Sequence, residues 1–124
     1  TAHVVFTAID PARPATQSPG VVRDIIRGHI GFDGLLMSDD LSMKALGGDF
    51  TSRTAAILDA GCDMVLHCNG EMAEMDASAR AARPMTPAAM VRARRALALI
   101  AGPRRPIDRG QAEKRLDALL ALAA

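Results

Sequence analysis

Two neighbouring carboxylates, Asp39 and Asp40, directly follow a short apolar run that ends at Ser38. Adjacent carboxylates raise each other's pKa, so such a pair is costly unless its members have separate roles. Successive residues of an extended chain point in different directions, so we expect one carboxylate to face a cleft and the other to cap the turn over residues 41–44. The sequence leaves open the alternative that both are loop-capping residues.

Other reactive side chains do not form a recognisable centre. His3, His67 and Cys68 are spread from position 3 to position 68, unlike the close and regular spacing of zinc ligands. We expect His67 to be a buried histidine bonded to a backbone group, and the thiols of Cys62 and Cys68 to be reduced. The sequence has no nucleophile-elbow pattern for a catalytic serine and no glycine-rich phosphate loop after a strand. It therefore predicts neither a metal nor a cofactor.

Three short apolar runs, about 30 residues apart, are the expected strands of a parallel sheet, and because none of them alternates polar with apolar residues, we expect these strands to be buried on both faces. They cover residues 3–8, 34–38 and 63–68. In a parallel α/β arrangement the carboxyl ends of the strands share one edge, where ligands bind. Asp39 and Asp40 follow the second run, so this pattern predicts that they lie at that edge.

Helical segments separate and follow these runs. The first is expected to begin at Ser18-Pro19 and the second at Thr51, because an N-cap residue precedes an apolar periodic stretch in each. They should end at Gly31 and Gly61, respectively. After the third run the sequence predicts helices alone. These expected helices cover Glu71 to Arg83, a segment after Thr86-Pro87, and a last segment containing Leu116, Leu119, Leu120 and Ala123.

Composition excludes some classes of partner. Aromatic residues are 2% of the chain, so base-stacking platforms for single-stranded nucleic acid are not expected. No apolar run has the length of a membrane-spanning helix, and we expect no membrane partner. Residues 92–124 hold eight basic and three acidic side chains, which leaves open a non-catalytic binding module that uses this basic tail.

Several strings of the sequence resemble family-3 glycoside hydrolases, and in particular their bacterial β-N-acetylhexosaminidase branch, the β-N-acetylglucosaminidases of cell-wall recycling. The resemblance extends over about residues 1–70. It rests on Thr1-Ala-His-Val-Val5, Ala8-Ile-Asp10, Pro14-Ala-Thr-Gln-Ser18, Gly31-Phe-Asp-Gly-Leu-Leu-Met-Ser-Asp-Asp-Leu-Ser-Met-Lys-Ala45 and Ala60-Gly-Cys-Asp-Met-Val-Leu-His-Cys-Asn69.

This resemblance implies a fold and a mechanism. The family fold is a (β/α)8 barrel, in which residues 1–84 would form about the last three βα units and residues 85–124 terminal helices that pack on the barrel. The family nucleophile maps onto Asp39 and not onto Asp40, in a retaining mechanism that passes through a covalent glycosyl-enzyme. His3 and Met43 are the residues that the resemblance suggests for substrate binding.

The resemblance also implies a substrate and an incomplete site. The expected substrate is a muropeptide with a terminal β-1,4-linked N-acetylglucosamine, in the cytoplasm, and no metal or organic cofactor takes part. The family's acid/base histidine belongs to a loop motif upstream of Thr1, so we expect the chain to be a C-terminal piece of a longer protein. Its partner would be the missing N-terminal part, and the isolated chain should be inactive. A β-glucosidase-like relative remains the alternative enzyme.

Overall fold

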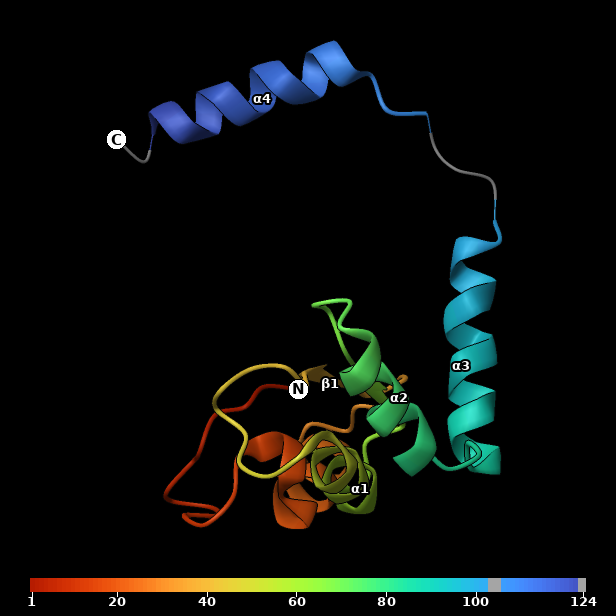
Figure 1. The fold of residues 1–124 in the computed structure, drawn as a ribbon. Helices are drawn as coiled ribbons and strands as arrows, with labels where there is room; N and C mark the ends of the chain where they lie inside the picture. The colour runs from red at the N-terminus through yellow and green to blue at the C-terminus, as the bar shows by residue number, and fades with distance from the viewer. Residues whose placement is uncertain (103–105, 123–124) are drawn as a thin grey trace.

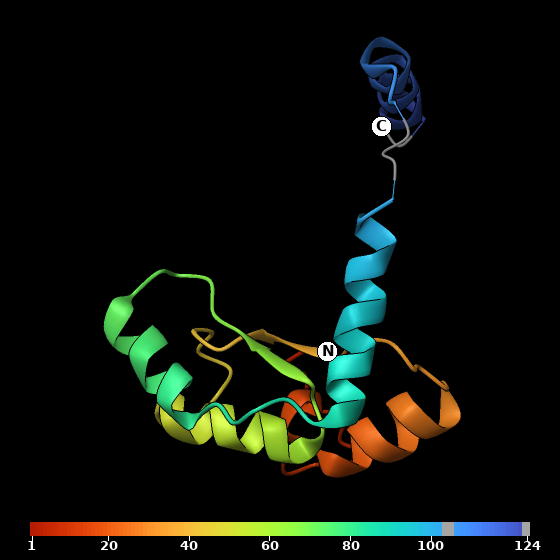
Figure 2. The ribbon, with the colours of Figure 1, turned by 90° about the vertical axis from the view of Figure 1, so that its right-hand side faces the viewer.

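A computed structural model describes residues 1–102 and 106–122 of the chain. Two parallel strands, β1 (Met37–Asp40) and β2 (Met64–Leu66), lie at its centre. Helices η2 (Val21–His29) and α1 (Phe50–Ala60) both lie on one side of this strand pair (Figures 1 and 2). The α/β class and the parallel pairing predicted for the second and third runs are confirmed.

The remaining elements surround or follow this centre. A short 3₁₀ turn, η1 (Ala15–Gln17), precedes η2, and α2 (Met72–Ala81), α3 (Pro87–Ile100) and α4 (Arg109–Ala121) follow β2. None of the residues of α4 is buried. Ala123, expected in the last helix, lies outside the described residues. No helix in the described ranges has both the length and the apolar character needed to cross a membrane.

Local sequence signals set most helix ends. The Ser18 hydroxyl accepts a hydrogen bond from the amide of Val21 (3.2 Å), and the Thr86 hydroxyl accepts one from Ala89 (3.1 Å), so both predicted caps are confirmed. Gly61 ends α1 with a positive φ of 106°. The prediction of Thr51 as the cap of this helix is wrong.

Asp49 is the cap of α1 instead. Its carboxylate accepts a hydrogen bond from the amide of Ser52 (2.7 Å), so the helix begins at Phe50. A carboxylate one residue before the first turn satisfies a free amide and also favours the positive end of the helix dipole. Thr51 therefore lies within the first turn of α1 and not ahead of it.

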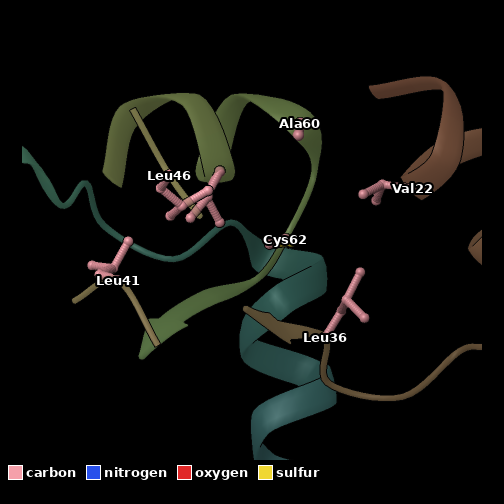
Figure 3. Packing of buried hydrophobic residues seen from close by; sticks show 7 residues of the cluster. Val22, Leu36, Leu41, Leu46, Ala60 and Cys62 are labelled. Atoms are coloured by element: carbon pink, nitrogen blue, oxygen red, sulfur yellow. The ribbon is translucent and has the colours of Figure 1, made fainter. Parts of the chain in front are cut away.

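The core lies between the strand pair and the helices beside it. Residues from both helices and from the ends of the strands meet there, and Figure 3 shows how most of them pack. They are Val22, Leu36, Leu41, Leu46, Ile57, Ala60 and Cys62. The opposite face of the strands is open, because the paired residues Met37 and Met64 are both exposed. The strands are therefore buried on one face only. The prediction that they are buried on both faces is wrong.

The first apolar run does not form the predicted strand. The carbonyl of Val4 accepts a hydrogen bond from Ala15 (2.8 Å), and that of Phe6 accepts bonds from Ile9 (2.8 Å) and Asp10 (2.9 Å). The Phe6 carbonyl closes a turn and the Val4 carbonyl is bonded to a more distant loop residue, so neither is available to a strand ladder. The side chains of this run are also largely exposed, as Val4 is 49% accessible.

The start of this run nevertheless lies beside β1. The terminal amine of Thr1 donates to the carbonyl of Met37 (2.8 Å), and the ring of His3 contacts the carbonyl of Asp40 (2.9 Å). Thr1 lies beside Met37 and His3 lies beside Asp40, so the first segment and β1 run in the same direction. The first apolar run therefore lies next to β1, as predicted, but no regular ladder of backbone hydrogen bonds joins the two.

Asp63 links four parts of the chain at the start of β2. One carboxylate oxygen accepts from the guanidinium of Arg27 (2.8 Å) and from the amide of Leu36 (2.9 Å). The other accepts from Arg92 of α3 (2.9 Å). The Asp63 side chain is only 4% accessible, so each of its oxygens is satisfied by the protein and not by water. This arrangement ties α3 and η2 to the strands.

The two free cysteines should differ in reactivity. Burial raises the pKa of the Cys62 thiol to about 11, whereas Cys68 is exposed. The thiolate is the reactive form, so loss of thiolate alone should slow alkylation of Cys62 about 100-fold relative to the unfolded chain. Iodoacetamide labelling at pH 8, followed by mass spectrometry, should therefore modify Cys68 first in the folded chain and both cysteines in urea. Equal labelling of both in the folded chain would contradict the burial of Cys62.

Candidate active site

An irregularity in the strand pairing places Asp39. Met37 pairs with Met64 and Asp40 pairs with Leu66, so three steps along β1 match two steps along β2. The extra residue lies at Ser38 or Asp39. The hydroxyl of Ser38 accepts a hydrogen bond from the amide of Leu66 (3.0 Å), where a regular ladder would offer a carbonyl. Bulges of this kind change the direction of a side chain and are frequent beside active sites.

The two neighbouring carboxylates have different environments. One oxygen of Asp40 accepts from the amides of Ser42 (3.0 Å) and Cys68 (3.1 Å), and the other accepts from the hydroxyl of Ser42. In the part of the chain that the structure describes, the carboxylate of Asp39 accepts a single hydrogen bond, from the amide of Asp40 (2.8 Å) to Oδ1. Within the described residues, Oδ2 of Asp39 has no donor. The expected capping carboxylate is present and is Asp40, whereas a cleft in front of Asp39 stays a prediction.

Asp40 also has a fixed charge. The hydroxyl and amide of Ser42 hold the pKa of the Asp40 carboxyl below its usual range, with a further contribution from the amide of Cys68. Asp40 is therefore ionised at neutral pH and already occupied by donors from the ends of both strands. An occupied carboxylate is poorly placed to react with a ligand, which leaves Asp39 as the candidate.

His3 lies next to this carboxylate pair with both ring nitrogens engaged. Nε2 is 2.9 Å from the carbonyl oxygen of Asp40, and Nδ1 is 2.8 Å from the hydroxyl of Thr16. Neither ring nitrogen is left for a hydrogen bond to a ligand. The structure brings His3 to the candidate site, as the resemblance suggests, but gives its polar atoms other partners.

Met43 belongs to the turn that follows β1. Its amide donates to the carbonyl of Asp40 (3.1 Å), and its side chain is exposed. The side chain therefore lies at the same end of the strand as Asp39 and can contact a ligand through apolar surface. Its role in substrate binding remains a prediction.

His67 does not have the partner that the sequence suggested. Its Nε2 contacts the carboxylate of Glu74 in α2 (2.9 Å), not a backbone group. Asn69 donates to the same carboxylate oxygen (2.7 Å), and these two neighbours lower the pKa of Glu74. The ring also packs edge-on against Phe50, with 5.6 Å between the ring centres. These contacts fix α2 beside the carboxyl end of β2.

Three of the eight basic side chains in residues 92–124 are paired within the chain. Arg92 contacts Asp63 (2.9 Å), Arg95 contacts Asp33 (2.7 Å) and Arg109 contacts Glu113 (2.7 Å). Arg104 and Arg105 lie outside the described residues. Because these three arginines already face carboxylates, the observed contacts do not favour an anion-binding tail. Within residues 1–102 and 106–122, no group of three or more His, Cys, Asp or Glu side chains is arranged to hold a metal ion.

The fold and site together define an α/β segment with a free carboxylate at the carboxyl end of a parallel strand. Residues 1–97 match the family described as the glycosyl hydrolase family 3 N terminal domain. The chain belongs to this glycoside hydrolase family.

Relatives of known name agree with this membership. The chain is 50% identical over 70 residues to a beta-hexosaminidase of Shewanella frigidimarina. This match covers 55% of the chain and 20% of that protein. It is 41% identical over 104 residues to a beta-hexosaminidase of Bordetella avium. This match covers 82% of the chain and 29% of that protein. A family 3 beta-N-acetylglucosaminidase structure from a Paenibacillus species matches 89% of the chain and 24% of its own length, with 28% identity and a TM-score of 0.67. The chain thus spans well under a third of these relatives.

Sequence reasoning missed two contributors to the site. Thr16 is fully buried and bonded to His3, although it is 13 residues away along the chain. The hydroxyl of Ser38 replaces a backbone group in the strand pairing. The position of Ser38 directly before the carboxylate pair was a visible signal for its role. Nothing in the sequence near Thr16 indicated its contact with His3.

Proposed function

We propose that this chain is the nucleophile-bearing part of a retaining exo-β-N-acetylglucosaminidase, with Asp39 as the nucleophile. The observation that carries the proposal is the unequal use of the two carboxylates: Asp40 is held by Ser42 and Cys68, whereas Oδ2 of Asp39 is free. The names of the relatives, beta-hexosaminidase and beta-N-acetylglucosaminidase, support the choice of sugar.

The proposed reaction has two displacements at one carbon. An oxygen of Asp39 bonds to the anomeric carbon while the glycosidic C–O bond breaks, and the leaving oxygen takes a proton from a general acid. Water then bonds to the same carbon, the ester bond to Asp39 breaks, and the proton of the water goes to the same group acting as a base. Neither step requires a metal or an organic cofactor.

The general acid is proposed to come from another part of a longer polypeptide. Asp40 is already bonded to three donors, and both ring nitrogens of His3 are engaged, so neither is placed to move a proton. The small share of the relatives' length that the chain covers supports this proposal. We expect the 124-residue chain to show no appreciable turnover by itself.

The proposed setting is a (β/α)8 barrel. Residues 1–84 would supply about three of its βα units, and residues 85–124 the helices that pack on it. The exposed face of the strand pair, which carries Met37 and Met64, supports an arrangement in which that face turns towards further strands. The salt bridge between Arg92 and Asp63 supports attachment of α3 to the strands.

The proposed substrate is a muropeptide with a terminal β-1,4-linked N-acetylglucosamine, cleaved in the cytoplasm during peptidoglycan recycling. This part of the proposal rests on the resemblance of residues 31–45 and 60–69 to the hexosaminidase branch of the family. The groups that select the sugar would lie largely in the rest of the polypeptide.

A pair of chromogenic substrates tests the proposal. The full-length polypeptide that contains this sequence should hydrolyse a nitrophenyl N-acetyl-β-glucosaminide and release the sugar with its β configuration retained, as observed by proton NMR. The same enzyme should hydrolyse the matching nitrophenyl β-glucoside at least about 100-fold less efficiently, because pocket groups built for the acetamido group would be left unpaired. A preference for the glucoside would support the β-glucosidase alternative, and an inverted product would exclude a covalent role for Asp39.

A further inference from the structure

His3 joins three segments of the chain at the candidate active site. Its ring lies between the hydroxyl of Thr16 in η1 and the carbonyl of Asp40 at the end of β1. The same carbonyl accepts a hydrogen bond from Met43 and so closes the turn after the strand. His3 thus contacts the backbone atom on which this turn depends.

The two partners impose one tautomer on the ring. A carbonyl oxygen can only accept a hydrogen bond, so Nε2 of His3 must carry the proton that it shares with Asp40. In the neutral ring, Nδ1 then accepts a hydrogen bond from the Thr16 hydroxyl. Thr16 is fully buried, so its hydroxyl has little freedom to find another partner.

Asp40 transmits this constraint to its neighbour. The amide of Asp40 donates to Oδ1 of Asp39 (2.8 Å), while its carbonyl is held by His3 (2.9 Å). A change in the orientation of the Asp40 backbone would therefore move the hydrogen bond that orients the Asp39 carboxylate. The carboxylate of Asp40, held by Ser42 and Cys68, fixes the same residue from its other side.

We propose that His3 is a positioning residue for the nucleophile: through its Nε2 proton it holds the Asp40 backbone, and thereby the Asp39 carboxylate, in the orientation for attack on the sugar. The proposal rests on the function proposed above. It differs from the substrate contact suggested by the resemblance, because it assigns both ring nitrogens to the protein. Misplacement of a reacting group by about 1 Å costs on the order of 100-fold in rate, so a loss of this kind is measurable.

Two amide side chains separate the roles of the two nitrogens. The amide nitrogen of glutamine reaches about as far as Nε2 and can donate to Asp40, whereas asparagine reaches only as far as Nδ1. In the full-length enzyme, His3→Asn should lower kcat about 10- to 100-fold with little change in KM. His3→Gln should restore kcat to within about threefold of the original enzyme. The assay uses a nitrophenyl N-acetyl-β-glucosaminide.

Each other outcome overturns the proposal. Equal activity of both variants and the original enzyme would show that the Nε2 contact does not matter. An equal loss in both variants, or a rise in KM without a fall in kcat, would indicate a structural role or a sugar contact. Absence of turnover in the original enzyme would contradict the proposed function itself. In that case, ¹⁵N NMR of the histidine ring in the full-length polypeptide distinguishes the two failures: a proton on Nε2 leaves the contact to Asp40 intact, and a proton on Nδ1 in place of Nε2 refutes the contact as well.

A second pair of variants applies if His3→Asn does not fold. Thr16→Val removes the hydroxyl that holds Nδ1, and Thr16→Ser keeps it. Thr16→Val should lower kcat about 10-fold with KM unchanged, while Thr16→Ser should stay close to the original enzyme. Equal kcat values for these two variants would contradict the proposed chain of contacts.

Discussion

Replacing Asp39 with alanine should abolish turnover by the full-length enzyme, with a loss in kcat on the order of 10⁴-fold or more. The expected loss is large because the variant has no oxygen to form the bond to the anomeric carbon. Among the described residues, the side chain of Asp39 is hydrogen-bonded only to the amide of Asp40 and makes no hydrogen bond to another element. The variant should therefore keep its fold, as measured by circular dichroism and by its unfolding midpoint.

Asp40→Asn is the matched control for this experiment. It keeps the size of the side chain and one acceptor oxygen for the amides of Ser42 and Cys68, so we expect a loss of less than about 100-fold in kcat. Azide should restore turnover to Asp39→Ala by attacking from the vacated side, which gives the α-glycosyl azide. It should not accelerate Asp40→Asn. The reverse pattern would assign the nucleophile to Asp40.

Replacing Asp63 with alanine should destabilise the chain by about 3–5 kcal/mol, the usual cost of removing one partner from a buried ion pair. The variant leaves Arg27 (18% exposed) without its carboxylate partner and Arg92 (22% exposed) with only the more distant Asp33, at 3.9 Å. It also removes the acceptor for the amide of Leu36. Urea unfolding followed by circular dichroism measures the change in free energy.

The salt bridge between Asp59 and Arg83 provides the comparison. Its N–O distance of 2.7 Å is as short as those of Asp63, but its side chains are 65% and 54% exposed. Asp59→Ala should therefore cost less than about 1 kcal/mol, since water replaces the lost partner. Similar losses in the two variants would show that the burial of Asp63 contributes little.

The sequence predicts those features that depend on neighbouring residues. Thr86 lies directly before α3, Ser18 lies directly before the helical residues 19–20 that lead into η2, and Gly61 lies directly after the helix that it ends. The separate roles of Asp39 and Asp40 were expected because adjacent side chains of an extended strand diverge. For the two caps the physical cause lies within three residues, whereas the donors that hold Asp40 include the amide of Cys68, 28 residues away.

Features that depend on distant partners were not predictable in this way. Asp63 bonds to Arg27 and Arg92, which are 36 and 29 residues away, and no local pattern indicates either contact. The first apolar run has the composition of a strand, but the carbonyl of Val4 is used by Ala15. Composition alone does not show where a carbonyl finds its partner.

The bulge in β1 has a consequence for how the length of this segment can change during evolution. Met37 is fixed by its pairing with Met64, and Leu41 is fully buried in the core, so the number of residues between them is set at both ends. An insertion or deletion there must displace either the free carboxylate or the core leucine. The exposed glycines at positions 47 and 48 can absorb such changes. Homologous chains should therefore differ in length after Leu46, while the spacing from Met37 to Leu41 stays constant even where the residue types change.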